Sequence, residues 1–205
     1  DRFEMMSFEM KNLKKILFTG SNLINFDLSE YENKEFTLFK NLEKMSFVNC
    51  LNNFNIFEQI LFKNTDIKVL NFFKCGLINS YIPDLIIILK ECPLLEHLDL
   101  SSNNFTDFNI HKYQDFENPA YFHSIKFLSL SYNNLSSIKI NKYFTNLKIL
   151  NLSSNNFCSG SDIIHYRNLY SEECLILSNK NQFVNKNIES QSLYIDYLMK
   201  MLKIM

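Results

Sequence analysis

Three segments of the chain align with one another without gaps, and this self-similarity limits the fold more than any other feature. They read LEHLDLSSNNF from residue 95, IKFLSLSYNNL from residue 125 and LKILNLSSNNF from residue 147. Each follows the pattern LxxLxLxxNxL, with one apolar residue replacing another at the aliphatic positions. We number these positions one to eleven in every copy. Matches at all the fixed positions of three segments indicate a repeating unit of structure.

Looser copies of the pattern extend toward the N-terminus. They begin at Leu13, Leu42 and Ile67, which makes six copies starting at residues 13, 42, 67, 95, 125 and 147. The intervals are 29, 25, 28, 30 and 22 residues, close to the lengths of known short repeats of a strand and a crossover. A degenerate seventh copy is expected around Cys174, Ile176 and Asn179.

The spacing within each copy predicts a short strand followed by a turn. Because side chains alternate between the faces of a strand, positions four and six point into the core, and positions three, five and seven point outward. The Asn at position nine lies where the chain leaves the strand, and its amide can bond backbone groups of the turn and of the adjacent repeat. Cysteine is an accepted alternative there, which gives Cys50 and Cys75 a structural role.

Helices are expected in the segments that connect the strands. Ser80–Glu91 has the pattern of a helix with Ser80 as its N-cap and Pro83 in its first turn. Residues 55–63 and 161–171 are further helix candidates. The 22-residue interval after Ile125 leaves room for only a short turn, such as Ile138–Phe144.

The stretch from Ile82 to Phe105, a predicted helix followed by ECPLLEHLDLSSNNF, resembles the leucine-rich-repeat superfamily, including its helix-bearing, ribonuclease-inhibitor-like class. The resemblance extends from residue 13 to about residue 180. It implies an α/β solenoid, a curved right-handed superhelix with a parallel sheet on the concave face and helices and turns on the convex face. It also implies partner binding on the concave face. The chain departs from the pattern in its uneven repeat lengths, in Asn52 at an apolar position, and in Ser21, Cys50 and Cys75 at position nine.

The chain divides into three parts on this interpretation. Residues 1–12 are the end of a preceding crossover or an N-terminal cap, residues 13–183 hold the repeats, and residues 184–205 form a C-terminal helical cap. A solenoid needs its apolar end covered, which favours the cap for residues 184–205. For residues 1–12 we favour the end of a preceding crossover over a cap. The alternative for the apolar segment 190–205 is a docking helix for a partner or a membrane surface.

Composition narrows the classes of function. The chain has 205 residues and a formal net charge of −1, which gives no electrostatic case for nucleic acid or an anionic membrane. No apolar run is long enough to span a bilayer. Five cysteines without CxxC spacing argue against a disulfide framework or a zinc site and favour a reducing compartment, cytoplasmic or nuclear. Phosphate-binding and hydrolase motifs are missing, so we expect no enzyme, metal or cofactor.

The outward positions give the candidate binding surface. Outward strand residues are usually polar unless something covers them, and several here are apolar. The predicted partner-binding residues are Val69, Asn71, Phe73, His97, Asp99, Phe127, Ser129, Tyr132, Ile149 and Asn151. Seven lysines against three carboxylates at these and the adjoining positions make the face mildly basic, which favours an acidic protein partner. The oligomeric state is open.

The sequence therefore predicts a non-catalytic protein-interaction module that binds its partner on the concave strands. Two alternatives stay open. A GTPase-activating protein of the helix-bearing repeat type would need a catalytic arginine, and the chain holds only Arg2 and Arg167. A substrate-receptor subunit of a ubiquitin ligase would need an upstream motif that binds an adaptor.

Overall fold

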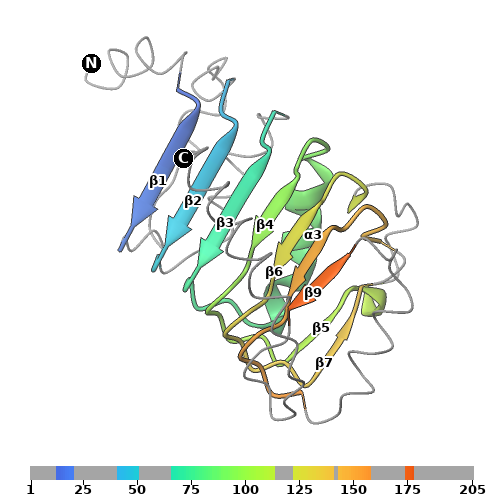
Figure 1. The fold of residues 1–205 in the computed structure, drawn as a ribbon. Helices are drawn as coiled ribbons and strands as arrows, with labels where there is room; N and C mark the ends of the chain where they lie inside the picture. Colours follow the sequence, from blue (N-terminus) through green and yellow to red (C-terminus); the bar gives the residue numbers. More distant parts are fainter. Residues whose placement is uncertain are drawn as a thin grey trace.

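The repeats stack into one parallel sheet (Figure 1). The computed structural model describes residues 13–20, 41–50, 66–113, 122–140, 143–157 and 174–177. Seven strands follow the order β1-β2-β3-β4-β6-β8-β9, so each copy of the pattern adds its strand beside the previous one. The strands of this sheet are β1 (Lys15–Thr19), β2 (Lys44–Val48), β3 (Val69–Phe73), β4 (His97–Asp99), β6 (Phe127–Ser129), β8 (Ile149–Asn151) and β9 (Leu175–Leu177). The strand β9 belongs to the degenerate seventh copy.

The predicted register is confirmed. From β2 to β8, the side chains at positions four and six are all 0% exposed: Met45, Phe47, Leu70, Phe72, Leu98, Leu100, Leu128, Leu130, Leu150 and Leu152. The parallel ladder places equal positions opposite one another, as in Leu98, which pairs with Leu70 and Leu128. A slip by one residue would turn the whole row outward, and burying each such side chain contributes about 1.5–3 kcal/mol. Burial of these rows therefore fixes the register.

Aromatic rings stack along the solenoid axis inside this core. The rings of Phe18 and Phe47 lie 5.0 Å apart and nearly parallel, and Phe47 lies 5.5 Å from Phe72. On the side of the crossovers, Phe122 and Phe144 are buried with their ring centroids 5.1 Å apart. Such pairs contribute about 0.5–1.5 kcal/mol beyond their buried area. The stacked rings join neighbouring repeats into one core.

An asparagine ladder closes the turn after each strand in the C-terminal repeats. The side-chain nitrogen of Asn103 donates to the carbonyl oxygens of Phe72 (2.8 Å) and Leu100 (2.9 Å). Its oxygen accepts from the amides of Cys75 (2.9 Å) and Leu77 (3.0 Å). Asn133 and Asn155 make the equivalent bonds in the next two copies. Each position-nine amide thus bonds its own turn and the preceding repeat, as the spacing predicts.

Cysteine takes over part of this role in the earlier copies. The thiol of Cys75 lies 3.3 Å from the carbonyl oxygen of Phe47, and that of Cys50 lies 3.5 Å from the carbonyl oxygen of Phe18. These are the same carbonyls, one repeat earlier, that the asparagines bond. Both cysteines are buried. The structural role predicted for Cys50 and Cys75 is therefore confirmed.

Position eight of each copy adopts a left-handed backbone. The φ angles are 53° at Asn49, 56° at Lys74, 57° at Ser102, 53° at Tyr132 and 56° at Ser154, with Gly20 at the equivalent place. In this conformation the amides of the first five copies reach the position-seven carbonyl of the next repeat, as Lys74 does with Ser101 at 3.1 Å. The left-handed region is costly for a bulky side chain such as Tyr132. The bond between repeats offsets part of that cost.

Among the described residues there is one α-helix, α3 (Ile82–Lys90), on the convex side (Figure 1). It buries Leu85, Ile86 and Leu89, and Asp84 and Lys90 match the helix dipole at its two ends. The prediction of Ser80 as N-cap is wrong, because a 3-10 turn, η3 (Asn79–Tyr81), comes first and leaves Tyr81 as the cap. The predicted helices 55–63 and 161–171 lie outside the described residues.

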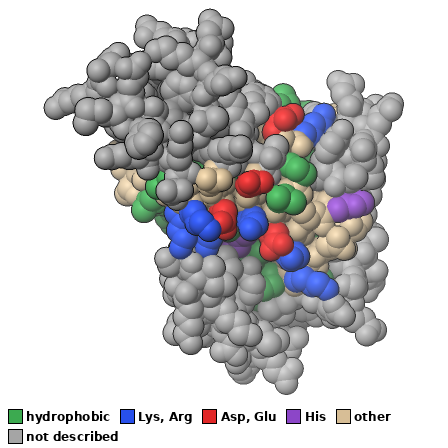
Figure 2. All heavy atoms as spheres, turned by 90° about the horizontal axis from the view of Figure 1, so that it is seen from above, with side chains coloured by type: hydrophobic (Ala, Val, Ile, Leu, Met, Phe, Trp, Pro, Cys, Tyr) green, Lys and Arg blue, Asp and Glu red, His purple; other side chains and the backbone are tan. Residues whose placement is uncertain are grey.

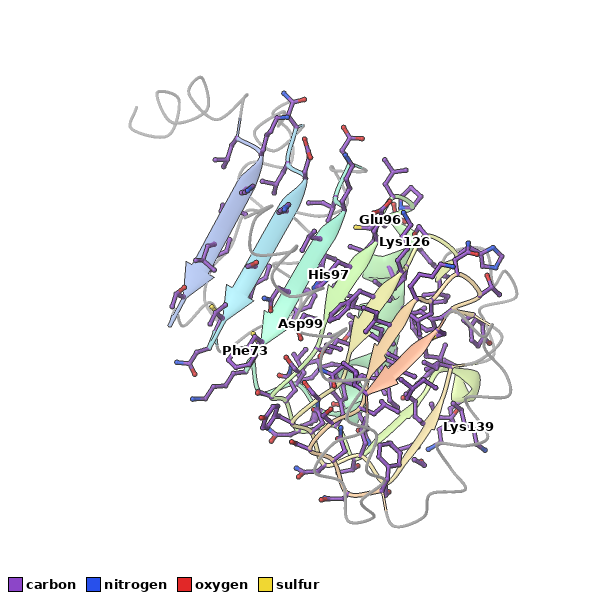
Figure 3. The ribbon with its side chains drawn as sticks, viewed as in Figure 1. Phe73, Glu96, His97, Asp99, Lys126 and Lys139 are labelled. Carbon is purple, nitrogen blue, oxygen red and sulfur yellow. The ribbon has the colours of Figure 1, made fainter. Side chains whose placement is uncertain are left out.

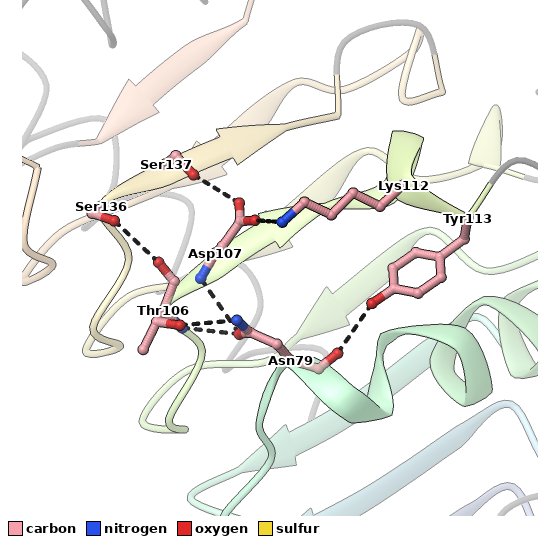
Figure 4. Close-up of polar contacts among 7 residues, drawn as sticks. All are labelled: Asn79, Thr106, Asp107, Lys112, Tyr113, Ser136 and Ser137. Carbon is pink, nitrogen blue, oxygen red and sulfur yellow. Dashed lines mark hydrogen bonds and ion pairs between the residues drawn. The ribbon is translucent and has the colours of Figure 1, made fainter.

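A second, two-stranded parallel sheet forms where only turns were expected. It pairs β5 (Asp107–Asn109) with β7 (Ser137–Lys139), and a 3-10 turn, η4 (Ile110–Lys112), follows β5. Figure 4 shows the polar contacts around this sheet. The Asp107 carboxylate accepts a hydrogen bond from the Ser137 hydroxyl at 2.7 Å and forms an ion pair with Lys112. The Asn79 side chain donates to the Thr106 hydroxyl. The prediction of a short turn over Ile138–Phe144 is therefore wrong for Ile138 and Lys139, which belong to β7. The expected terminal parts, 1–12 and 184–205, lie outside the described residues.

Candidate functional site

The outward side chains of the seven-stranded sheet form two rows across its concave face (Figure 3). Position three aligns Lys15, Lys44, Val69, His97, Phe127 and Ile149, and position five aligns Leu17, Ser46, Asn71, Asp99, Ser129, Asn151 and Leu177. All the predicted site residues except Phe73 and Tyr132 lie in these rows. Phe73 is at position seven of β3, and Tyr132 follows β6 in the turn. The sheet thus brings the predicted residues together on one face.

Exposure falls along both rows from β1 toward β9. Leu17 is 64% exposed, and Val69, Asn71, His97 and Asp99 are partly buried. Phe127, Ser129, Ile149 and Asn151 are at most 7% exposed. We therefore distinguish an open half of the concave face, the outward residues of β1, β2 and β3, from a covered half, those of β6, β8 and β9.

The covered half corrects one prediction. Phe127 and Ile149 were expected to form an exposed apolar patch, but they are only 3% and 7% exposed. With Leu177 they make a small apolar cluster separate from the main core. Ser129 and Asn151 are likewise buried. None of these four side chains is accessible to a partner in this structure.

His97 lies at the border between the two halves. Its ring stacks on that of Phe127, with centroids 4.0 Å apart and planes 2° from parallel. Burial, and then the charge of Lys44, lower the pKa of His97 to about 4, so the ring is neutral at pH 7. Its Nδ1 is buried without a hydrogen-bond partner in the described part of the chain. His97 therefore packs like an aromatic residue.

The polar residues of position five have a local structural role. Their side-chain oxygens accept the backbone amide two residues later: Phe73 to Asn71 (2.8 Å), Ser101 to Asp99 (2.9 Å) and Ser153 to Asn151 (3.1 Å). Such a bond stabilises the turn that follows the strand. Burial raises the pKa of the Asp99 carboxyl, and the hydroxyl and amide of Ser101 lower it less.

The raised pKa of Asp99 predicts a pH-dependent stability. A group whose pKa is raised on folding costs folding free energy once the pH rises above its unfolded-state pKa, and the full cost is present above its folded-state pKa. Asparagine, which occupies the same position of the pattern at residues 71 and 151, has a side-chain oxygen that accepts the same hydrogen bond but carries no charge. We expect Asp99→Asn to raise the melting temperature modestly at pH 7, and the gain to vanish as the pH falls below about 4. Equal melting temperatures of the two proteins at pH 7 would contradict this.

The open half carries accessible apolar side chains. Leu17 is 64% exposed at the centre of β1, and Val48 on β2 and Val69 and Phe73 on β3 are partly buried. Tyr132, 58% exposed, lies outside this half, in the left-handed turn after β6. Sequence reasoning left Leu17 out of the site, although an apolar residue at an outward position was the available signal.

Charged side chains alternate along the edge where the strands begin, at position two of each copy. Figure 2 looks down on this edge and shows basic and acidic side chains side by side. Lys14 and Lys68 pair with Glu43 at 3.0 and 3.6 Å, and Lys126 pairs with Glu96 at 2.7 Å. The pKa of Glu43 is lowered, first by its bond to Lys14. Three of the seven lysines counted above, Lys14, Lys68 and Lys126, thus pair with carboxylates of this edge. Lys15 and Lys44 lie on the face itself, and Lys74 follows β3.

The described residues do not bring together an activated nucleophile or a set of metal ligands. Burial raises the pKa of the Cys92 thiol to about 12, which is opposite to what a nucleophile needs. Among these residues, no three His, Cys, Asp or Glu side chains come together as a metal site. Within the same ranges, no helix has the length and apolar character to cross a bilayer.

The stacked parallel strands, the inward aliphatic positions and the asparagine ladder define a leucine-rich-repeat solenoid. A solved structure with the same architecture is that of internalin C2 from Listeria monocytogenes str. 4b F2365. It aligns with a TM-score of 0.52 and 14% identity, over 89% of this chain and 67% of that one. At that identity the likeness shows the fold alone. No family model matches the chain, and no curated protein matches it. The finer helix-bearing class stays a prediction.

Proposed function

We propose that this chain is a non-catalytic protein-interaction module that binds a protein partner on the open half of its concave face. The observation that carries the proposal is the exposure of Leu17 on β1, 64%, on the same face as the partly exposed Val69 and Phe73 of β3. Outward strand residues are usually polar, and an accessible apolar patch with a polar surround is typical of a binding surface. Asn71, His97 and Asp99 border this patch, and Tyr132 lies farther along the sheet, in the turn after β6.

The charges of the open half favour an acidic partner. Lys15 and Lys44 are opposite each other in the ladder between β1 and β2, and Lys74 is exposed after β3. The pKa of Lys44 is lowered by burial and then by the charge of Lys15, so the two ammonium groups repel each other. The charge of Glu43 acts on Lys44 in the opposite direction. Charges at the margin of an interface act more on the association rate than on the affinity.

Affinity capture with full-length variants tests the proposal. Val69→Glu and Lys15→Glu should each lower the recovery of a true partner about tenfold or more, because buried contacts and charge complementarity are both lost. Lys139→Glu makes the same charge change on β7, away from this face, and should leave recovery unchanged. Quantitative mass spectrometry of the captured proteins gives the ratios. Recovery that is the same for all four baits would refute the site.

The buried residues change the design of this experiment. Charging Phe127 or Ile149 would place a carboxylate in a buried cluster, so loss of capture could follow from unfolding. Val69 is partly exposed and Lys15 is exposed, so both accept a charge more easily. Melting curves of each variant, compared with the parent protein, separate the two causes.

We also propose a location for the protein. An intracellular location, cytoplasmic or nuclear, is supported by the unbridged thiols of Cys50, Cys75, Cys92 and Cys174. The GTPase-activating and ubiquitin-ligase alternatives gain no supporting observation. Arg2 and Arg167, the residues on which the first would depend, lie outside the described residues.

A further inference from the structure

Two cysteines occupy the same position of adjacent repeats. Cys50 and Cys75 both stand at position nine, in the turns that follow β2 and β3. The ladder between these strands pairs Val48 with Phe73. It continues into the turns, where the amide of Asn49 donates to the carbonyl oxygen of Phe73 at 2.9 Å. The two cysteines are therefore direct neighbours along the solenoid axis.

The spacing of the repeats brings the two side chains within reach of a covalent bond. Paired strands lie about 4.8 Å apart, and disulfides join residues whose Cα atoms are about 4.4–6.8 Å apart. The Cys75 thiol leans toward the repeat that holds Cys50, because it lies 3.3 Å from the carbonyl oxygen of Phe47. The Cys50 thiol lies 3.5 Å from the carbonyl oxygen of Phe18, one repeat earlier, so it must rotate about its Cα–Cβ bond to meet Cys75. A thiol is a weak donor, so this rotation gives up little.

We propose that Cys50 and Cys75 are a site of reversible oxidation, at which a peroxide joins the two repeats through a disulfide. One thiol, as its thiolate, attacks the peroxide, becomes a sulfenic acid and releases water. The second sulfur then attacks the first, displaces its oxygen as water and forms the sulfur–sulfur bond. The two thiols together lose two electrons and two protons, and hydrogen peroxide is reduced to two molecules of water.

Burial makes the site selective. Cys50 is 0% exposed and Cys75 is 4% exposed, so a small peroxide reaches these thiols more easily than a bulky alkylating reagent does. A neighbouring thiol converts the sulfenic acid into a disulfide, which prevents further oxidation to a sulfinic acid. Burial, and then the charge of Glu91, raise the pKa of Cys92 to about 12, so its thiolate is scarce. We therefore expect Cys92 to remain a thiol under the same treatment.

The bond would change the edge of the open half. The Cβ atoms of a disulfide lie about 3.8 Å apart, so the two turns would move about 1 Å closer than the strand spacing holds them. Asn49 and Lys74, which directly precede the two cysteines, are exposed at this edge. Oxidation would therefore draw these two side chains together beside Val48 and Phe73 of the open half.

Peptide mapping of the full chain tests the proposal. The folded protein is treated with hydrogen peroxide, the remaining thiols are alkylated in denaturant, and tryptic peptides are identified by mass spectrometry. We expect peptides 45–63 and 75–90 to appear joined, with a mass two hydrogen atoms below their sum. Treatment of the folded protein with a thiol reductant before alkylation should separate them again.

Two controls accompany the mapping. In protein unfolded in urea, any two of the five cysteines can meet, so several different links should form. Cys75→Asn places at position nine the residue that Asn103 supplies in the next copy, and it should yield no link from Cys50.

Three results for the folded parent protein would overturn the proposal. They are thiols at Cys50 and Cys75 that survive the peroxide, separate oxidation of each to a sulfinic acid, and links to other cysteines in place of the link between these two. The binding proposal for the open half depends on neither thiol, so it would stand after any of them.

Discussion

Asn103→Ala is expected to lower the free energy of unfolding by about 3–5 kcal/mol. The Asn103 side chain accepts from two amides, those of Cys75 and Leu77, and donates to the carbonyl oxygens of Phe72 and Leu100. Alanine would leave these buried groups without a partner, and each such group costs about 1–3 kcal/mol. Urea denaturation followed by far-UV circular dichroism measures the loss. The estimate is below the full sum because a relaxed turn can regain some bonds.

The adjacent asparagine supplies the control. Asn104 is exposed, and its side chain makes none of the ladder bonds. Asn104→Ala should change the free energy of unfolding by no more than about 0.5 kcal/mol. Asn133→Ala should lie between the two, because its oxygen accepts from one amide, that of Phe105. A denaturation midpoint for Asn103→Ala equal to that of Asn104→Ala would contradict the ladder.

Phe72→Ala is the second substitution with a large expected effect, a loss of about 3–5 kcal/mol in the free energy of unfolding. Phe72 is 0% exposed at position six, and its ring stacks 5.5 Å from that of Phe47. Removing the ring leaves a cavity between two repeats, where the fixed ladder prevents the strands from closing in. The same denaturation measurement applies, with an unchanged slope against urea if only stability has altered.

Phe73, the next residue, tests the opposite face. It points outward from β3 and is partly exposed, so Phe73→Ala should cost less than about 1 kcal/mol. It should instead weaken partner capture, if the open half is the binding surface. One pair of neighbouring phenylalanines thus separates a residue needed for folding from one needed for binding. Equal losses of stability for the two variants would contradict the assigned register.

The sequence alone was enough to predict the repeat, the inward rows and the asparagine ladder. The reason is physical: alternation along a strand and the geometry of the turn act within a single copy, so the eleven-residue pattern carries them. The role of Cys75 was also predictable, because its thiol can reach the carbonyl oxygen that an asparagine at the same position would reach. The opposite faces of Leu98 and Val69 follow from the same alternation.

The remaining features depend on contacts that no single copy encodes. Phe127 and Val69 occupy the same position of the pattern, yet one is 3% exposed and the other is partly open to solvent. The sheet of β5 and β7 likewise depends on two crossovers running side by side. A left-handed Tyr132 could not be foreseen from its residue type, which disfavours that conformation.

The central claim is that successive strand residues face opposite sides, so that one set forms the core and the other forms the binding surface. Hydroxyl-radical footprinting of the full chain, read residue by residue by mass spectrometry, tests it most directly. We expect fast oxidation at Leu17 and Tyr132, slower oxidation at Phe73, and protection of Phe72 and Leu98. Faster oxidation of Phe72 than of Phe73 would contradict the register and the surface built on it.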